Sequence, residues 1–248
     1  MTKVLILCAH RPNRSPSQRF RFEQYLTFLE SHGFSFTYSF LLNKKDDHIF
    51  YSQGKLIQKV FILLKSLFIR LKDVLRFKKF DFIFIQREAG FLGTSSFESF
   101  AFHSGAKVIF DFDDSIWIAD TSPGNKKWEW VKRPQKFFNN VSYAYSVIAG
   151  NAYLAQIAKP HNKNIKIIPS TIDTEIHKPL EGLKNKYYTT IGWSGSISTI
   201  KHFEILIPVF ERLKSKYGEK IKFKITALIN VLFPAAFAPV INIFFMRN

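Results

Sequence analysis

Three carboxylates stand close together at the end of a predicted strand. Asp111, Asp113 and Asp114 follow the apolar run Val108-Ile109-Phe110. Alternation along a strand puts Asp111 and Asp113 on one side, and Asp114 enters the next loop. Neighbouring carboxylates can orient a hydroxyl, accept a proton or hold a divalent cation. Asp also caps helices and forms turns, but three acids beside a buried strand favour a functional site with Asp113 and Asp114 as candidates.

Arginines surround the loop that follows the first predicted strand. They are Arg11, Arg14, Arg19 and Arg21, and Arg87 follows a third predicted strand. Guanidinium groups beside a helix start suit a phosphate or a sugar acid. A solvated basic face is the alternative for each of the first four, and an ion pair with Glu88 is the alternative for Arg87.

A loop of small residues, 192–199, follows a β-rich run and precedes a predicted helix that begins near Ile200. Glycines let a backbone approach a phosphate, and the free N–H groups of a helix start face it. A lysine just after such a loop can neutralise a diphosphate. The candidate residues are Gly192, Gly195, Ser196, Thr199 and Lys201. The loop matches neither the P-loop nor the dinucleotide fingerprint, so by itself it is a weak signal.

Histidine and cysteine usage predicts neither a metal centre nor a disulfide framework. The seven histidines show no H-x-x-H or H-E-x-x-H spacing, and His10 alone lies at the expected site. The single cysteine, Cys8, lies inside the first predicted strand and is expected to be a core residue. The apolar start is too short for a signal peptide, so we expect a cytoplasmic location.

The chain has 248 residues and a net charge of +17, which suits an anionic partner. We find no zinc-finger spacing, RNA-recognition signature or basic-region heptad, and therefore predict no nucleic-acid binding. The clearest basic cluster lies on the predicted helix 54–79, which also carries an apolar stripe. Two readings stay open: a helix packed on the sheet with a solvated basic face, or peripheral contact with an anionic membrane.

The pattern alternates strands and helices, which predicts an α/β fold with a doubly wound parallel sheet. Loops after such strands share one edge, where ligands bind. The expected strands are 3–9, 34–42, 80–86, 107–112, 146–149 and 165–168, and the expected helices are 15–32, 54–79, 128–140 and 151–159.

Four segments are expected along the chain. Residues 1–168 form a Rossmann-like domain, 169–186 a linker, 187–226 a partial second α/β domain, and 227–248 a hydrophobic tail. The second domain is expected to contain strands 187–193 and 221–225 and helix 200–217. The tail is interrupted by Pro234 and Pro239. A membrane anchor, a buried segment and an out-of-frame tail are its open origins, and the last is favoured.

The order of these motifs resembles the GT-B glycosyltransferases of the family-four type. The residues that carry the resemblance are Ser15 to Arg21, Phe84 to Glu88, Val108 to Asp114, Val147 to Asn151, Ile167 to Thr174 and Ile191 to Lys201. It covers roughly residues 3–225. It implies two Rossmann-like domains, an acceptor-binding one first and a nucleotide-sugar-binding one second, usually without a metal or other cofactor.

The resemblance implies sugar transfer from a nucleotide diphosphate sugar to a glycan or lipid-linked acceptor, as in polysaccharide and cell-envelope biosynthesis. Asp113 and Asp114 occupy the place of the family's His-Asp near the transferred sugar, and Arg19 and Arg87 lie on the acceptor side. Gly192, Gly195, Ser196, Thr199 and Lys201 would hold the donor diphosphate. The family's two-glutamate donor motif is not found, so we expect a truncated chain of little activity. The alternative is a non-catalytic module that binds a glycan or an anionic lipid surface.

Overall fold

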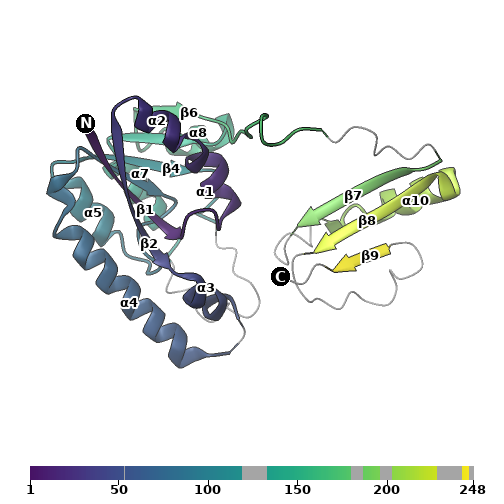
Figure 1. The fold of residues 1–248 in the computed structure, drawn as a ribbon, viewed down its shortest axis with the longest axis horizontal. Coiled ribbons are helices and arrows are strands. Elements are labelled where there is room, and N and C mark those ends of the chain that lie inside the picture. The colour runs from purple at the N-terminus through teal and green to yellow at the C-terminus, as the bar shows by residue number, and fades with distance from the viewer. Residues whose placement is uncertain (53, 119–132, 180–186, 196–202, 228–241, 246–248) are drawn as a thin grey trace. The chain divides into compact units, whose positions relative to one another are not determined.

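The computed structural model describes the chain apart from residues 53, 119–132, 180–186, 196–202, 228–241 and 246–248 (Figure 1). Contacts within the chain divide it into two compact units, Met1–His177 and Lys178–Asn248. The division falls inside the predicted linker 169–186, whose outer limits stay a prediction.

The first unit is built on a six-stranded parallel sheet with the order β2-β1-β3-β4-β5-β6. This confirms the predicted doubly wound α/β fold. Its strands are β1 Thr2–His10, β2 Phe34–Leu42, β3 Phe82–Gln86, β4 Lys107–Phe112, β5 Ser146–Ala149 and β6 Ile165–Ile167.

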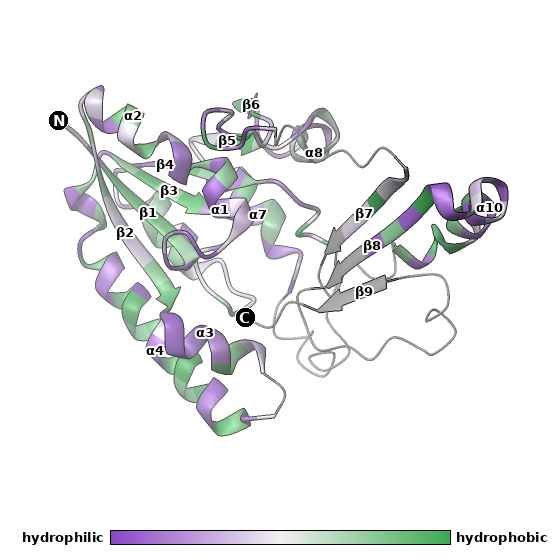
Figure 2. Ribbon diagram, turned by 45° about the vertical axis from the view of Figure 1, so that its right-hand side comes forward, coloured by the Kyte–Doolittle hydropathy of each residue, from purple (hydrophilic) through white to green (hydrophobic). Residues whose placement is uncertain are grey.

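Successive residues of β1 contribute to two different cores, one on each face of the sheet. Leu5 and Leu7 belong to the larger cluster with Phe110, whereas Ile6 and Cys8 pack in a second cluster. Side chains alternate across a strand, and a parallel sheet covered on both faces needs apolar residues at every position. Figure 2 shows this as continuous green along the central strands.

The helices of the first unit differ from the expected ones at three places, and one is the predicted helix 128–140, of which 133–135 are not helical and 128–132 lie outside the described residues. They are α1 Pro16–Arg21, α2 Leu26–Ser31, α3 Lys44–Tyr51, α4 Leu56–Val74, α5 Ser96–Phe102, α7 Lys136–Tyr143 and α8 Ala152–Ala158, with 3-10 turns η1 Glu23–Tyr25 and η2 Phe77–Lys79. The predicted helix 15–32 is broken at Phe22, whose φ of −144° leaves the helical region. Phe22 turns into the core against Phe84, at a ring-centroid distance of 5.2 Å. Helix α3 was not predicted.

Helix α4 buries part of the side that the sequence would have placed in solvent. Its buried residues are Ile62, Ser66, Arg70 and Asp73. Arg70 donates to Ser39 Oγ at 2.7 Å, to the carbonyl of Cys8 at 2.9 Å and to Asp73 Oδ2 at 2.9 Å. It also donates to the carbonyl of Ala89. Packing of the apolar stripe on the sheet, one of the two readings left open, is confirmed in part: Leu67 packs against the larger core, whereas Leu64 and Phe68 are exposed.

The second unit has a smaller parallel sheet with the order β7-β8-β9. Its elements are β7 Thr189–Gly195, α10 Ile207–Tyr217, η5 Gly218–Lys220, β8 Ile221–Ala227 and β9 Asn242–Phe245. Phe203 and Phe223 are its buried hydrophobic residues within the described part, and Trp193 and Phe210 pack against them. Strand β9 lies inside the predicted tail 227–248 and continues the sheet beside β8. Among the described residues, no helix is both long and apolar enough to cross a bilayer.

Candidate functional site

The carboxyl ends of β1, β3 and β4 lie where the order of the sheet reverses. The chain moves from β1 to β2 on one side and to β3 on the other, so the loops that follow β1 and β3 diverge. Ligands of open parallel sheets bind in the crevice that this divergence leaves. Hydrogen bonds join the loops here, as the sequence predicted: Gln86 to Ser17, Ser17 to Asp113, Gly150 to Phe112, and Arg21 to Ile168.

Asp113 has one carboxylate oxygen that accepts a hydrogen bond and one, ion-paired with Arg87, that accepts none within the described residues. Gln86 Nε2 donates to Ser17 Oγ at 2.9 Å, and Ser17 Oγ donates to Asp113 Oδ2 at 2.6 Å. The other oxygen, Oδ1, is buried, lies 3.4 Å from Arg87 Nε, and has no hydrogen-bond partner among the described residues. Buried polar atoms are normally paired. An oriented carboxylate with an oxygen that accepts no hydrogen bond can receive the hydroxyl of a substrate.

Gly150 lets the backbone pass close behind Asp113. Its N–H donates to the carbonyl of Phe112 at 3.0 Å. A Cβ at position 150 would lie 3.1 Å from Asp113 Cα and 3.4 Å from Asp113 Cβ. Glycine permits such an approach, so a side chain at position 150 would displace Asp113.

Arg87 is held at the two aspartates by an unusual backbone conformation. Its φ is +66°, in the left-handed region that residues other than glycine rarely adopt. Its N–H donates to the carbonyl of Asp111 at 2.8 Å, and its Nη2 donates to Asp114 Oδ2 at 2.7 Å. Glu88, the alternative partner considered from the sequence, pairs with Lys136 at 2.7 Å instead.

The two predicted carboxylates differ in burial. The side chain of Asp113 is 18% exposed, whereas that of Asp114 is 72% exposed. Exposed ion pairs contribute at most about 1 kcal/mol, because water screens them. Asp113 therefore lies in the more restrained environment, and Asp114 mainly completes the hydrogen bonds of Arg87.

Asp47 gathers a basic cluster that the sequence did not reveal. It is 6% exposed, and its Oδ2 accepts hydrogen bonds from Arg14 Nε at 2.5 Å and from Arg11 Nη1 at 3.3 Å. Its Oδ1 lies 3.6 Å from Nδ1 of His10. Two guanidinium groups that share one carboxylate leave a positive excess and unused N–H groups. Such an arrangement suits a phosphate or a carboxylate.

The signal that could have found this cluster is local. Asn43 precedes α3, and its side chain accepts a hydrogen bond from the N–H of Asp46 at 2.8 Å. Asp46 and Asp47 then occupy the first turn. A capping residue followed by acids is a helix-start pattern.

His10 is neutral in its surroundings. Burial lowers its pKa, and the nearby Asp47 only partly opposes this shift. Its Nε2 lies 3.3 Å from the hydroxyl of Tyr51, and the two rings stack with centroids 5.9 Å apart. Burial raises the pKa of Tyr51 to about 12, so this hydroxyl keeps its proton.

Arg21, not Arg19, is the buried arginine of α1. It forms an ion pair with Asp111 in which both side chains are at most 2% exposed, and it donates to the carbonyl of Ile168. These contacts fix α1 against β4 and leave neither group free for a ligand. Arg19 is exposed, with its guanidinium 5.6 Å from the ring centroid of Phe20. Its acceptor-side role stays a prediction.

In the second unit, the glycines predicted to start the Gly/Ser loop lie in a strand. Strand β7 continues to Gly195, and Gly192 and Gly195 pair in register with Lys224 and Ala227 of β8. The strand extends beyond the predicted end because β8 offers backbone partners along its whole length. Ser196, Thr199 and Lys201 lie outside the described residues. Within the described part of both units, no group of three His, Cys, Asp or Glu side chains could hold a metal ion.

No protein-family model matches the sequence, and no curated protein matches it. Solved structures match its fold. The S. aureus MnaA-UDP co-structure has a TM-score of 0.55 at 14% identity, covering 93% of this chain and 63% of that one. The OtsA apo structure has a TM-score of 0.56 at 13% identity, covering 94% and 66%.

The fold is GT-B-like. An alpha-glucosyltransferase in complex with UDP and a 13-mer DNA containing an HMU base also matches, with a TM-score of 0.50 at 14% identity, covering 93% of this chain and 58% of that one. This chain therefore spans less than two thirds of the length of each of these three structures. At such low identity, the likeness concerns the GT-B-like fold alone.

Proposed function

We propose that this chain is part of a glycosyltransferase that moves a sugar from a nucleotide diphosphate sugar to a glycan or lipid-linked acceptor. The observation that carries the proposal is the buried Oδ1 of Asp113 at the switch point of a GT-B-like sheet, which is ion-paired with Arg87 but accepts no hydrogen bond within the described residues. The presence of UDP in two of the similar structures supports a nucleotide donor.

The first unit supplies the acceptor side. Asp113 receives the acceptor hydroxyl through Oδ1, while Ser17 keeps the other oxygen fixed. Arg87 forms ion pairs with both aspartates, and Arg19 borders the acceptor. The excess positive charge around Asp47 suits an acceptor that carries a phosphate or a sugar acid. Positioning a nucleophile in this way removes much of the entropic cost of its attack.

The second unit supplies the donor side. The leaving diphosphate is held by Gly195, Ser196, Thr199 and Lys201. Gly192, which has no side chain, leaves room for it. Backbone N–H groups and a lysine would stabilise the charge that develops on the diphosphate without a metal ion or other cofactor. We place the protein on the cytoplasmic face of the membrane, in cell-envelope polysaccharide synthesis.

The test is release of UDP from UDP-sugars in the presence of glycan and lipid-linked acceptors. We expect Asp113→Asn to lower kcat at least about 100-fold, as for a lost general base or hydroxyl-orienting group. The matched control is Asp114→Asn, whose side chain is exposed and whose loss we expect to cost less than about tenfold. Because little activity is expected of this chain, the comparison uses a sensitive UDP assay, and equal rates for wild type and Asp113→Asn would contradict the proposal.

A further inference from the structure

Helix α4 buries an ion pair on its inward side, next to Ile62, and leaves a row of apolar residues exposed on its outward side. Arg70 and Asp73 are at most 1% exposed and paired with each other, and Ser66 is buried beside them. The stability of the first unit therefore depends on this polar side of α4. Apolar residues on the opposite side are not needed for packing within the described part of the unit.

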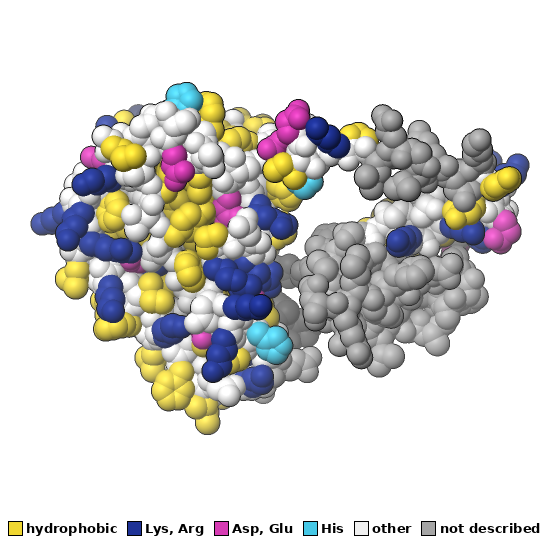
Figure 3. Space-filling model, viewed as in Figure 1, with side chains coloured by type: hydrophobic (Ala, Val, Ile, Leu, Met, Phe, Trp, Pro, Cys, Tyr) yellow, Lys and Arg dark blue, Asp and Glu magenta, His cyan; other side chains and the backbone are white. Residues whose placement is uncertain are grey.

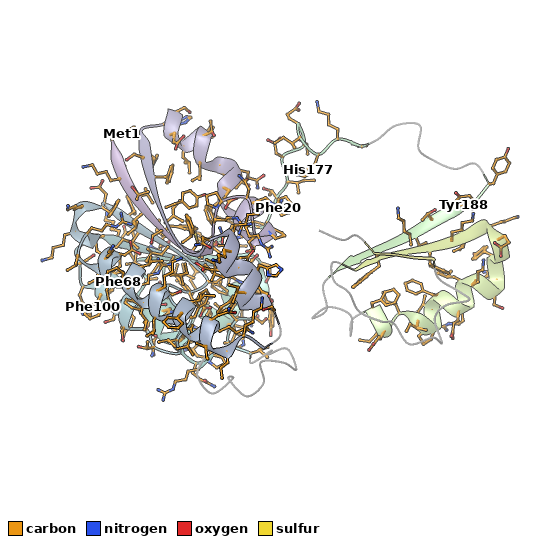
Figure 4. The ribbon with its side chains drawn as sticks, turned by 60° about the horizontal axis from the view of Figure 1, so that its bottom comes forward. Met1, Phe20, Phe68, Phe100, His177 and Tyr188 are labelled. Carbon is orange, nitrogen blue, oxygen red and sulfur yellow. The ribbon has the colours of Figure 1, made fainter. Side chains whose placement is uncertain are left out.

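The outward side of α4 is a continuous apolar stripe. Its exposed fractions are Ile57 72%, Val60 43%, Phe61 66%, Leu64 55%, Phe68 58%, Leu71 53% and Leu75 85%. The steps of three and four residues keep these side chains on one face of the helix. The helix has 19 residues and is thus about 28 Å long. Figure 4 labels Phe68 at the outer margin of the first unit. Contiguous exposed apolar patches rimmed by polar residues mark interaction sites.

Positive charges beside the stripe outnumber negative ones: Lys65 is paired with Asp46, and three further exposed lysines lie on or just after the helix. Lys65 and Lys72 are exposed on α4, and Lys78 and Lys79 follow it. The Nζ of Lys72 lies 4.5 Å from the ring centroid of Phe68. The acid of α4 is Asp73, which is buried between Arg70 and Arg76. Figure 3 shows yellow and dark-blue side chains intermingled where Figure 1 places α4.

From this charge pattern we infer that α4 docks on an anionic lipid surface. Its stripe enters the boundary between headgroups and acyl chains, and its lysines contact lipid phosphates. A second copy of this chain fits less well, because a two-fold contact would place the lysines of one copy against those of the other. The helix lies parallel to the membrane, since its inward side carries Arg70 and Asp73.

The test is co-flotation of the full chain with vesicles of equimolar phosphatidylglycerol and phosphatidylcholine. We expect binding that weakens about tenfold or more in the double variant Phe61→Ser/Phe68→Ser, because the apolar area entering the interface is lost. Both side chains are more than half exposed, so its thermal unfolding should match that of wild type. The control is Phe28→Ser, 61% exposed on α2, which should bind like wild type.

Two further measurements test whether the affinity depends on the negative charge of the lipid. Pure phosphatidylcholine vesicles should bind at least about tenfold more weakly, and added salt should weaken binding to the anionic vesicles. Three results would overturn the inference: no binding to anionic vesicles, equal binding of the double variant, or equal binding to neutral vesicles. If the wild type forms a dimer and the double variant is a monomer, the inference would likewise be overturned, because a second copy of the chain would then cover the stripe. Because neither donor nor acceptor is present, this test is independent of the proposed glycosyl transfer.

Discussion

The two units place comparable chemistry on very different supports. The first unit fixes its polar groups with buried ion pairs such as Arg21–Asp111 and Arg70–Asp73, on a six-stranded sheet. The second unit has a three-stranded sheet, and the residues proposed to bind the donor begin with small ones at the end of β7. Side chains that must orient an acceptor hydroxyl need a rigid frame. A diphosphate bound by backbone N–H groups requires only that the backbone can come close to it.

The largest effect should come from removing a buried support of the first unit. Arg70→Met leaves Asp73 with Arg76 and the Ser39 hydroxyl, and deprives the carbonyls of Cys8 and Ala89 of their donor. We expect a loss of about 3–5 kcal/mol in the free energy of unfolding, measured by urea denaturation. Arg76→Met is the matched control: it pairs with the same Asp73 but is 38% exposed, so about 1 kcal/mol is expected. Similar losses of unfolding free energy in both variants would show that burial does not determine how much each arginine contributes to stability.

A core substitution in the second unit should unfold that unit alone. Phe203 is 2% exposed and packs on Trp193 with ring centroids 5.1 Å apart. Phe203→Ala should cost about 3 kcal/mol, comparable to the stability of a small unit. We expect a changed Trp193 fluorescence and proteolysis confined to residues after His177. Val209→Ala, 40% exposed, is the control. Simultaneous unfolding of both units would contradict their independence.

The same glycine substitution should have opposite consequences in the two units. Gly150→Ala would bring Cβ to 3.1 Å from Asp113 Cα, and we expect a cost of about 1–3 kcal/mol. At Gly192 the nearest atom to an added Cβ is the Lys224 carbonyl oxygen, 3.9 Å away. Gly192→Ala should therefore stabilise slightly, by about 0.5 kcal/mol. Thermal unfolding of both variants tests this, and equal shifts would contradict it.

The smallest effect concerns pH. Burial raises the pKa of Glu98 above its ordinary 4.5, so in wild type stability is lost as pH rises from that value through the folded pKa. Glu98→Gln should remove this slope, which is at most about 1.4 kcal/mol per pH unit. In the second unit, a hydrogen bond from Lys214 lowers the pKa of the exposed Glu219. The contribution of Glu219 to stability is therefore lost as pH falls, opposite to that of Glu98. Glu219→Gln should remove this loss at low pH. Urea denaturation between pH 4 and 7.5 measures both, and parallel pH profiles would contradict the assignment.

The strands of the first unit could be predicted because the sequences of buried parallel strands are short apolar runs. The predicted bounds 34–42, 107–112 and 146–149 are those of β2, β4 and β5. Because the strands are parallel, the residues that follow β3 and β4 are expected at the same edge of the sheet, and Arg87 and Asp113 lie 3.4 Å apart there. The break at Phe22 could not be predicted, because tertiary packing on Phe84 causes it.

Long-range pairing explains what sequence reasoning missed. Asp47 became part of the site only because α3 brings it to Arg11 and Arg14, more than 30 residues away in sequence. The inward side of α4 was misjudged in part because periodicity identifies an apolar face but not which side is buried. The partners of Arg70 are the carbonyls and hydroxyl of distant segments, which no local pattern shows.

Calorimetric titration of the full chain with UDP-sugars tests the division of labour between the two units most directly. We predict measurable donor binding that weakens about tenfold in Lys201→Ala, as expected for one lost charge-assisted contact. Asp113→Asn should leave donor affinity unchanged, because we propose that Asp113 acts on the acceptor side. Absence of donor binding, or equal weakening by Lys201→Ala and Asp113→Asn, would contradict the account.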